Sequence, residues 1–294
     1  MKTNIKISAY AICAACVCFM LHFALSFITN IYYQIGFGFC AGIFLASLGE
    51  SYIHQYIGHA KAKVHAVWRR HPRAFMVLII GFFLHHVVHH GKTYREGYLE
   101  QFGESLDPNA VDTWAPEAFY RLFDAKDQAY VRKAMPAERI VEELHKADYG
   151  LGAVSTVAFA CLMLPLVAVV FVVAPFWMAL SAALPMLIIF PMMSDFIHRH
   201  MMHLPQDGVV VVRHDSSPSW LVGTPYMQAL ERWHWMHHEY IYCNYNLFVL
   251  ADFFRGVNRT PSPKDRQKMA TEGLILDDGG WSWMPFKRQS KLSK

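Results

Sequence analysis

Two long stretches without a formal charge most constrain how this chain can fold. Residues 7–49 and 151–194 contain no Asp, Glu, Lys or Arg over 43 and 44 positions. One membrane-spanning helix needs about 20 apolar residues, so each stretch can make two crossings and a tight turn. Polar or proline breaks at Asn30 and Pro175 fall near the two midpoints. The sequence therefore predicts an all-α integral membrane protein with two transmembrane helical hairpins. The four helices are expected at 7–29, 31–50, 151–173 and 176–196.

Basic residues around the first hairpin predict its orientation. Lys2 and Lys6 precede it, and five Lys and Arg residues follow it within residues 61–73. Because Lys and Arg in short loops remain on the cytoplasmic side, both ends of the hairpin are expected to face the cytoplasm. The apolar segment 74–84 has about eleven residues, too few for a crossing. We expect it to lie in the interface or to re-enter the membrane.

A charged insert, residues 91–150, separates the hairpins and holds twelve of the 23 acidic residues. Amphipathic patterns after Thr113 and Pro136 predict two helices there, which would form a cytoplasmic helical cap. The tail 257–294 is basic and suits an anionic membrane surface, and no nucleic-acid-binding motif accompanies its charge. We expect residues 1–256 to form one membrane domain followed by this tail, with no nucleic-acid partner.

Histidines gather beyond the ends of the apolar stretches. Of the seventeen histidines, twelve fall in four clusters. Imidazole is the commonest ligand of mid-to-late first-row metals, and isolated histidines do not bunch in this way. An even number of crossings places all four clusters on the cytoplasmic face, which predicts one polynuclear metal site there. The clusters are His54-x4-His59, His85-His86-x2-His89-His90, His198-x-His200-x2-His203 and His234-x2-His237-His238.

Two clusters contain the same H-x2-H-H triplet. Its members lie at helical positions i, i+3 and i+4, so they share one face and are expected to converge on one point. In the second cluster His85 could replace His86, which gives H-x3-H-H. The two triplets are His86, His89 and His90, and His234, His237 and His238.

A five-residue step characterises the other two clusters. In an ideal α-helix it rotates His59 by about 140° from His54, so the two rings converge only if the helix ends or bends between them. Gly58 would allow such a bend. His203 follows His198 by the same step, and the spacing leaves open whether His198 or His200 is its partner.

The number of imidazoles predicts two metal ions. Structural zinc takes four ligands and catalytic zinc about three, so this set is too large for one zinc. Two ions with four or five nitrogens each would keep open positions, and iron suits them because it binds dioxygen. The expected ligands are His54, His59, His86, His89, His90, His198, His203, His234, His237 and His238, with His85 and His200 as alternatives.

Carboxylates are expected to orient the imidazole N–H groups from outside the metal ligands. Glu50 lies one helical turn before His54, and Asp195 lies three residues before His198. Asn244 is a further polar candidate close after the last cluster.

In these residues the chain resembles the integral-membrane fatty acid hydroxylase and sterol desaturase superfamily. The resemblance covers about residues 40–256 and rests on the boxes named above, including Asp195-x2-His198. It is strongest where His234-Trp-Met-His237-His238 is followed by Asn244-Tyr245 and Asp252-x2-Arg255-Gly256. It departs from the family where Met202 stands four residues after His198, so His203 or His200 must complete the third box.

The resemblance implies a di-iron centre that uses dioxygen and two electrons to hydroxylate an unactivated C–H bond of a lipid or fatty acyl chain. The chain has no His-Pro-Gly-Gly haem motif. A separate ferredoxin or cytochrome b5-type partner is therefore expected to donate the electrons. A lipid or sterol desaturase, or a demethylating oxidase, of the same architecture is the nearest alternative. A metal-handling membrane protein is an alternative of another class, but transport would need ionisable residues inside the spans, where only His22 occurs.

Overall fold

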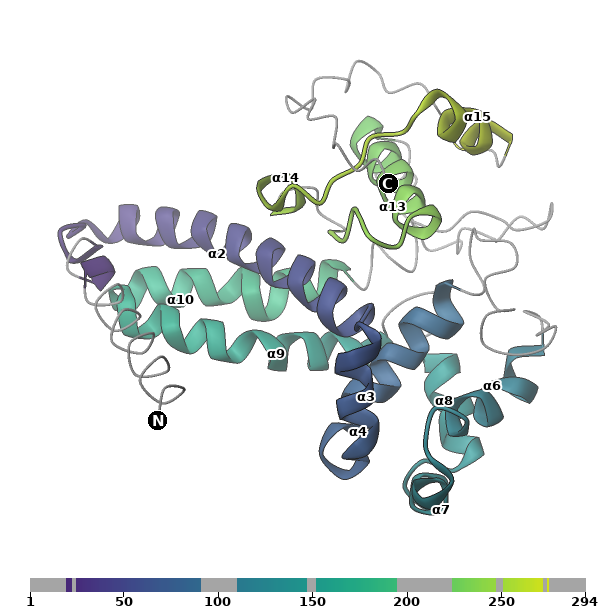
Figure 1. The fold of residues 1–294 in the computed structure, drawn as a ribbon. Helices are drawn as coiled ribbons and strands as arrows, with labels where there is room; N and C mark the ends of the chain where they lie inside the picture. Colours follow the sequence, from purple (N-terminus) through teal and green to yellow (C-terminus); the bar gives the residue numbers. More distant parts are fainter. Residues whose placement is uncertain are drawn as a thin grey trace, which may run out of the picture. The chain divides into compact units, whose positions relative to one another are not determined.

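A computed structural model describes residues 20–22, 25–90, 110–146, 152–194, 224–246, 251–271 and 274. Every regular element within these ranges is a helix (Figure 1), so the predicted all-α fold is confirmed for them. The chain divides into two compact units. Unit 1 comprises residues 1–49 and 157–192, and unit 2 comprises residues 50–156 and 193–294.

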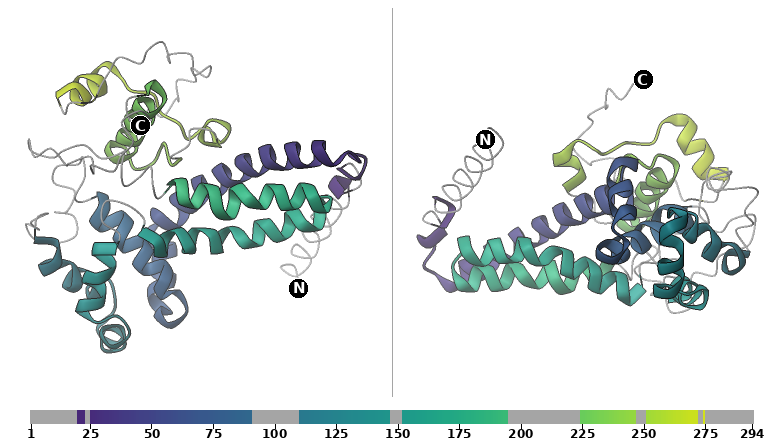
Figure 2. Two further views of the ribbon diagram at one scale, coloured as in Figure 1. Left: turned by 180° about the vertical axis from the view of Figure 1, so that it is seen from behind. Right: turned by 60° about the horizontal axis from the view of Figure 1, so that its bottom comes forward.

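Unit 1 is built from long apolar helices. They are α2 (Ile31–Ile53), α9 (Gly152–Val173) and α10 (Phe176–Leu184), and α10 continues through a wide π-helical turn, η5 (Pro185–Ile189). A tight turn at Pro175 joins α9 to α10, and these two helices lie side by side (Figures 1 and 2). These helices lie where the uncharged stretches predict them. The predicted helix 7–29 falls largely outside the described residues.

Close packing of α2 against α10 depends on two glycines. A Cβ atom at Gly38 would lie 2.2 Å from the carbonyl oxygen of Met178, and one at Gly42 would lie 2.4 Å from that of Ala182. The two glycines are four residues apart on α2, and Met178 and Ala182 are four residues apart on α10, so one face of each helix supplies the contact. Small residues at this spacing let membrane helices approach at backbone distance. The α2–α10 contact is of this kind.

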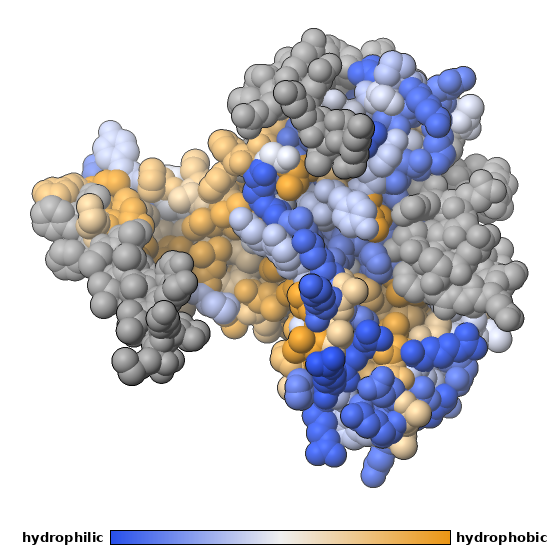
Figure 3. All heavy atoms as spheres, in the orientation of Figure 1, coloured by the Kyte–Doolittle hydropathy of each residue, from blue (hydrophilic) through white to orange (hydrophobic). Residues whose placement is uncertain are grey.

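Among the residues that the structure describes, three helices are long and apolar enough to cross a membrane. They span Ile31–Gly58, Pro72–His89 and Phe176–Ser194, with 28, 18 and 19 residues. Large apolar side chains on unit 1 are also exposed, among them Phe37 and Val172, and the surface over its helices is hydrophobic (Figure 3). Extended apolar surface of this kind is rare on soluble monomers and is consistent with membrane association.

The expected length of the segment 74–84 is corrected by the structure. The helix begins earlier, in α4 (Pro72–Phe82), and continues without a break through a second π-helical segment, η2 (Phe83–His89). It is therefore long enough to span, although its C-terminal turns carry histidines. The apolar pattern alone missed this because the polar ring nitrogens at His85 and beyond ended the hydrophobic run.

Within residues 110–146, the part of the charged insert that the structure describes, unit 2 contains three short helices, of which the first contacts η2. They are α6 (Val111–Tyr120), α7 (Ala125–Ala134) and α8 (Ala137–Lys146), so this described part alone holds one helix more than the two predicted. The ring of Phe119 meets that of Phe83 edge to face, with centroids 5.2 Å apart. This contact supports the helix that carries the second histidine cluster. Other buried members of the same core are Ile79, Tyr120, Val131 and Ile140.

The rest of unit 2 consists of α3 (Ala62–Arg70), α13 (Pro225–Glu239), α14 (Ala251–Arg255) and α15 (Pro263–Thr271). α13 carries the last histidine cluster. Its buried Trp235 packs against Met269 of α15, and the hydroxyl of Tyr240 donates a hydrogen bond of 2.6 Å to Asp265. The start of the predicted tail is thus packed against the helix that bears three histidines.

Candidate metal centre

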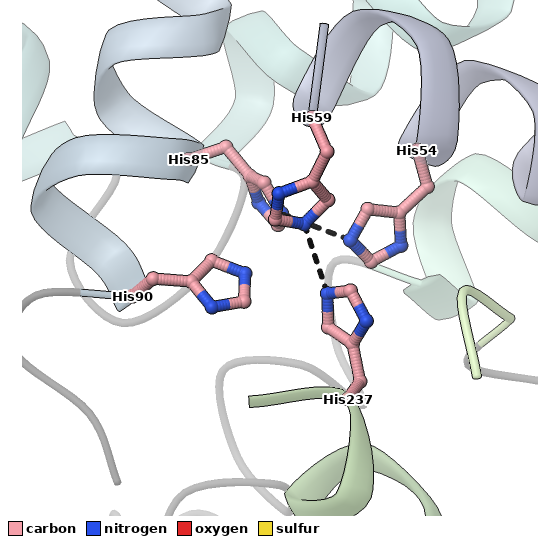
Figure 4. A group of neighbouring side chains, drawn as sticks. All are labelled: His54, His59, His85, His90 and His237. Carbon is pink, nitrogen blue, oxygen red and sulfur yellow. Dashed lines mark hydrogen bonds between the residues drawn. The ribbon is translucent and has the colours of Figure 1, made fainter. Parts of the chain in front are cut away.

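Eight imidazoles gather in two groups within unit 2. In each group the candidate ligand nitrogens all lie within 4.8 Å of one another. The rings of the first group point toward a common centre from three separate segments (Figure 4). The first group is His54, His59, His85, His90 and His237, and the second is His89, His234 and His238.

The two groups adjoin. The ring of His90, in the first group, stacks on that of His238, in the second, with centroids 4.2 Å apart. His238 in turn lies 3.0 Å, Nε2 to Nε2, from both His89 and His234. The groups thus form one continuous imidazole-lined site, and each group could hold a metal ion.

Two π-helical turns bring the first group together. The N–H of His59 donates to the carbonyl oxygen of His54, five residues earlier, at 2.9 Å, and η1 (His54–Gly58) closes the long helix in this way. A π-helix bonds i to i+5, so it places residues five apart on one face, and such turns are frequent at functional sites. His85 and His90 have the same five-residue spacing at the second π-helical segment, η2.

The members of each H-x2-H-H triplet are divided between the groups. Neither triplet converges on a single point: His90 and His237 join the first group, while His89 joins the second. His86 lies outside both groups, with its Nδ1 atom 2.8 Å from Nδ1 of His59. For the first triplet, the five-residue period of η2 explains the exclusion of His86, because it selects His85 as the partner of His90.

Gly58 permits the close approach of the second segment to the first. A Cβ atom there would lie 3.1 Å from Cδ2 of His85 and 3.3 Å from Cδ2 of His54. The residue predicted to let the helix end is thus also the one that leaves space for a neighbouring ring.

Backbone carbonyls orient two of the rings. Nδ1 of His54 lies 2.5 Å from the carbonyl oxygen of Tyr245, and Nδ1 of His237 lies 2.7 Å from that of Cys243. A carbonyl can only accept, so both rings carry their proton on Nδ1. Each neutral ring then presents an Nε2 lone pair, as a metal ligand must.

The short contacts among four Nε2 atoms are explained better by a bound cation than by hydrogen bonds between the rings. They run from His54 to His85 at 2.8 Å, from His85 to His59 at 3.1 Å, and from His59 to His237 at 3.0 Å. Each hydrogen bond needs one N–H and one lone pair. Both ends of this series are lone pairs, so no arrangement of neutral rings makes all three contacts hydrogen bonds. A metal ion that accepts four lone pairs satisfies every nitrogen.

The electrostatic environment keeps these rings neutral. Burial, reinforced by the neighbouring imidazoles, holds the pKa values of His59, His90 and His237 well below the usual range. Neutral imidazole is the form that binds metal. The donor set therefore fits a first-row metal such as iron, zinc or copper.

Two buried carboxylates anchor the loop that supplies the Tyr245 carbonyl. Glu50 accepts hydrogen bonds from the Ser194 hydroxyl at 3.0 Å and from the Asn246 side-chain amide at 2.9 Å. Asp252 accepts from the backbone N–H of Asn246 at 2.7 Å, and its own N–H donates to the Asn246 side chain at 2.9 Å. Glu50, predicted to orient an imidazole, is thus linked to His54 through the loop.

Arg255 extends this network and was not predicted as a site residue. Its guanidinium donates to the Ser51 hydroxyl and to the Gln55 side chain, and it lies over the Tyr52 ring at 3.9 Å. The Ser51 hydroxyl in turn donates to Asp252. The Asp-x2-Arg pattern was the sequence signal for this link between α14 and the end of α2.

Asn244, the third polar candidate, shapes the loop. Its backbone has a φ of 55°, in the left-handed region. Its amide nitrogen lies 3.3 Å from the carbonyl oxygen of Trp233 and 3.0 Å from that of Arg259, and its side-chain oxygen accepts the Arg259 N–H at 2.7 Å. The carbonyls of Cys243 and Tyr245 flank this fixed residue.

Four predicted site residues, Asp195, His198, His200 and His203, lie outside the described residues. No protein-family model, curated protein or solved structure matches the chain. The resemblance to the hydroxylase and desaturase superfamily therefore rests on the motifs alone.

Proposed function

We propose that the chain is a membrane di-iron oxygenase that hydroxylates an unactivated C–H bond of a lipid or fatty acyl chain. The observation that carries this proposal is the pair of adjoining imidazole groups, built on helices long enough to cross a membrane. Iron is the metal proposed because nitrogen ligands suit it and because it activates dioxygen.

The proposed reaction balances with an external reductant. One C–H bond, dioxygen, two electrons and two protons give one C–OH group and one water. When bound, the iron pair would supply the activation of dioxygen and the transfer of one oxygen atom to carbon. The electrons would come from a separate one-electron carrier of the ferredoxin or cytochrome b5 type.

Protein residues would hold the metals and keep bulk water away. His90, His237 and His238 are fully buried. A buried site limits side reactions with water, which matters for a step that attacks an inert C–H bond. The backbone carbonyls of Cys243 and Tyr245 would keep two ligand rings oriented throughout.

The position of the ligands within the candidate spans supports a lipid substrate. His54 lies in the last turns of Ile31–Gly58, and His85 and His89 lie in those of Pro72–His89. We propose that the end of Ile31–Gly58 meets the membrane surface on the cytoplasmic side, as the basic residues after the first hairpin indicate. Because Nε2 of His85 lies 2.8 Å from Nε2 of His54, we propose that Pro72–His89 ends at this same surface and does not cross the bilayer. A lipid could then reach the site without leaving the bilayer.

Lipid analysis tests this function. Cells with the unmodified protein, with His237→Ala, or without the protein would be compared by mass spectrometry of their lipid extracts under ¹⁸O₂. A lipid that gains one labelled oxygen only with the unmodified protein supports hydroxylation. Loss of two hydrogens instead would indicate the desaturase, and an unchanged lipid profile with metal bound would favour a metal-handling protein.

A further inference from the structure

Three ligand rings of the first group each have a separate hydrogen-bond acceptor on the side away from the group. His54 and His237 use the carbonyls of Tyr245 and Cys243, as described above. His59 uses His86: their Nδ1 atoms are 2.8 Å apart, while Nε2 of His59 faces His85 and His237. The same arrangement, Nδ1 outward and Nε2 inward, occurs in all three rings, two at the end of the long helix that contains α2 and one on α13.

The proton on His59 follows from this geometry if Nε2 binds metal. A metal-binding Nε2 must offer its lone pair, so the single proton of neutral His59 sits on Nδ1. That proton can be donated only to a lone pair, and Nδ1 of His86 is at hydrogen-bond distance. His86 then carries its own proton on Nε2.

The surroundings of His86 agree with a place outside the ring of metal ligands. Its ring lies beside that of Phe82, with centroids 4.8 Å apart, and Phe82 stacks on the buried His65 at 4.1 Å. By contrast, Nε2 of the adjacent His85 lies 2.8 Å and 3.1 Å from the Nε2 atoms of His54 and His59. Two neighbouring histidines therefore occupy chemically different places.

We infer that His86 is a positioning residue that fixes the tautomer of His59, and that His85, not His86, is the metal ligand. The Cys243 and Tyr245 carbonyls fix the tautomers of His237 and His54 in the same way as His86 fixes that of His59. This inference rests on the metal-binding part of the proposed function but not on the reaction or its substrate. It departs from the H-x2-H-H assignment, in which His86 is a ligand.

Asn244 makes the two carbonyl acceptors available together. Left-handed backbone is tolerated best by Gly, Asn and Asp, and here the Asn side chain is also bonded to two separate segments at Trp233 and Arg259. Asn244→Gly keeps the backbone conformation accessible and removes those bonds. The variant therefore separates the role of the side chain from that of the φ angle.

The same substitution at the two neighbouring histidines tests the inference. Asn places an acceptor near the position of imidazole Nδ1 but has no atom at Nε2. The full chain carrying His85→Asn, His86→Asn or His86→Leu would be purified in detergent and loaded with Fe²⁺ without oxygen. Metal per chain would be counted by mass spectrometry, and affinity would be measured by chelator competition. His71→Asn, at an exposed histidine, is the control.

We expect His85→Asn to lose the metal of the first group. His86→Asn should keep the full metal content with nearly unchanged affinity, and His86→Leu should keep it with an affinity about 10- to 100-fold weaker. Asn244→Gly should behave like His86→Leu. Loss of metal in His86→Asn while the protein elutes as a folded species, or full metal in His85→Asn, would overturn the inference.

Failure of the proposed function gives a different pattern. If the unmodified chain binds metal and the variants behave as expected but no lipid changes, the tautomer assignment stands and the oxygenase proposal falls. An unmodified chain that binds no metal would overturn both.

Discussion

Gly58 shows how a single residue controls the approach of two ligand segments. The two rings nearest to it, His54 and His85, belong to different helices, and a Cβ atom would contact both within 3.3 Å. The sequence suggested Gly58 as a place where the helix could end. It could not reveal that a second ring needs the same space, because His85 is distant in the chain and reaches it only through the tertiary fold.

Gly58→Ala should therefore weaken metal binding. Both rings must shift by a few tenths of an ångström, at a cost of about 1 kcal/mol, the lower end of the range for overpacking, which corresponds to roughly fivefold in affinity. Chelator competition on the purified protein measures the change. Gly81→Ala is the matched control, because a Cβ atom there has nothing within 4 Å. Equal affinities for the two variants would show that Gly58 is not a spacing residue.

Asp252 should matter for stability. It is fully buried and accepts hydrogen bonds from Ser51 and from the backbone of Asn246. Asp252→Ala leaves these donors without their acceptor and should lower the free energy of unfolding by about 1–3 kcal/mol. Denaturation in detergent would measure it, with Asp124→Ala, an exposed aspartate, for comparison. A loss no larger than that of the control would remove the network from the account.

At the scale of elements, the long helices were predictable and the turns that end them were not. Absence of charge predicted α2, α9 and the continuous helix Phe176–Ser194 that begins with α10 to within a few residues. The α-helical period of 3.6 placed His86 with His90, whereas η2 pairs His85 with His90. A π-helical turn contains one residue more than an α-helical turn, and no sequence signature marks it. The residue that shares a face with His90 is therefore His85 and not His86. The sequence had left His85 open as a replacement for His86 only because it precedes His86 and gives the pattern H-x3-H-H.

The contact between α2 and α10 gives a prediction at the same scale. Gly42→Ala would place a Cβ atom 2.4 Å from the Ala182 carbonyl and 2.6 Å from the Pro185 ring, which forces the helices apart. We expect a lower midpoint of thermal unfolding in detergent. Gly36→Ala, on the same helix with nothing within 4 Å, should be neutral or stabilising by up to about 1 kcal/mol. Equal stability of the two variants would contradict the close approach.

At the scale of the whole molecule, the candidate metal centre links segments that are far apart in sequence. His59 and His237 are 178 residues apart, yet their Nε2 atoms are 3.0 Å apart. The clusters and the expectation that they meet could be read from the sequence. The backbone carbonyls that orient the rings could not, because every residue has a carbonyl and only the fold selects two of them.

Removing the metal should therefore destabilise the whole of unit 2. An ion that binds the folded chain alone stabilises it by about 2.7 kcal/mol at 100 times the dissociation constant. Treatment with a strong chelator should lower the midpoint of thermal unfolding by several degrees, and added Fe²⁺ should restore it. An unchanged midpoint after verified metal removal would show that the imidazole groups are stable by themselves.

The most direct test of the central claim is the metal content of the purified full chain, measured together with that of His237→Ala and His89→Ala, one from each group. The account predicts about two irons per chain in the unmodified protein, as its two imidazole groups imply, and loss of iron in both variants. One zinc per chain, or full iron occupancy in both variants, would contradict it.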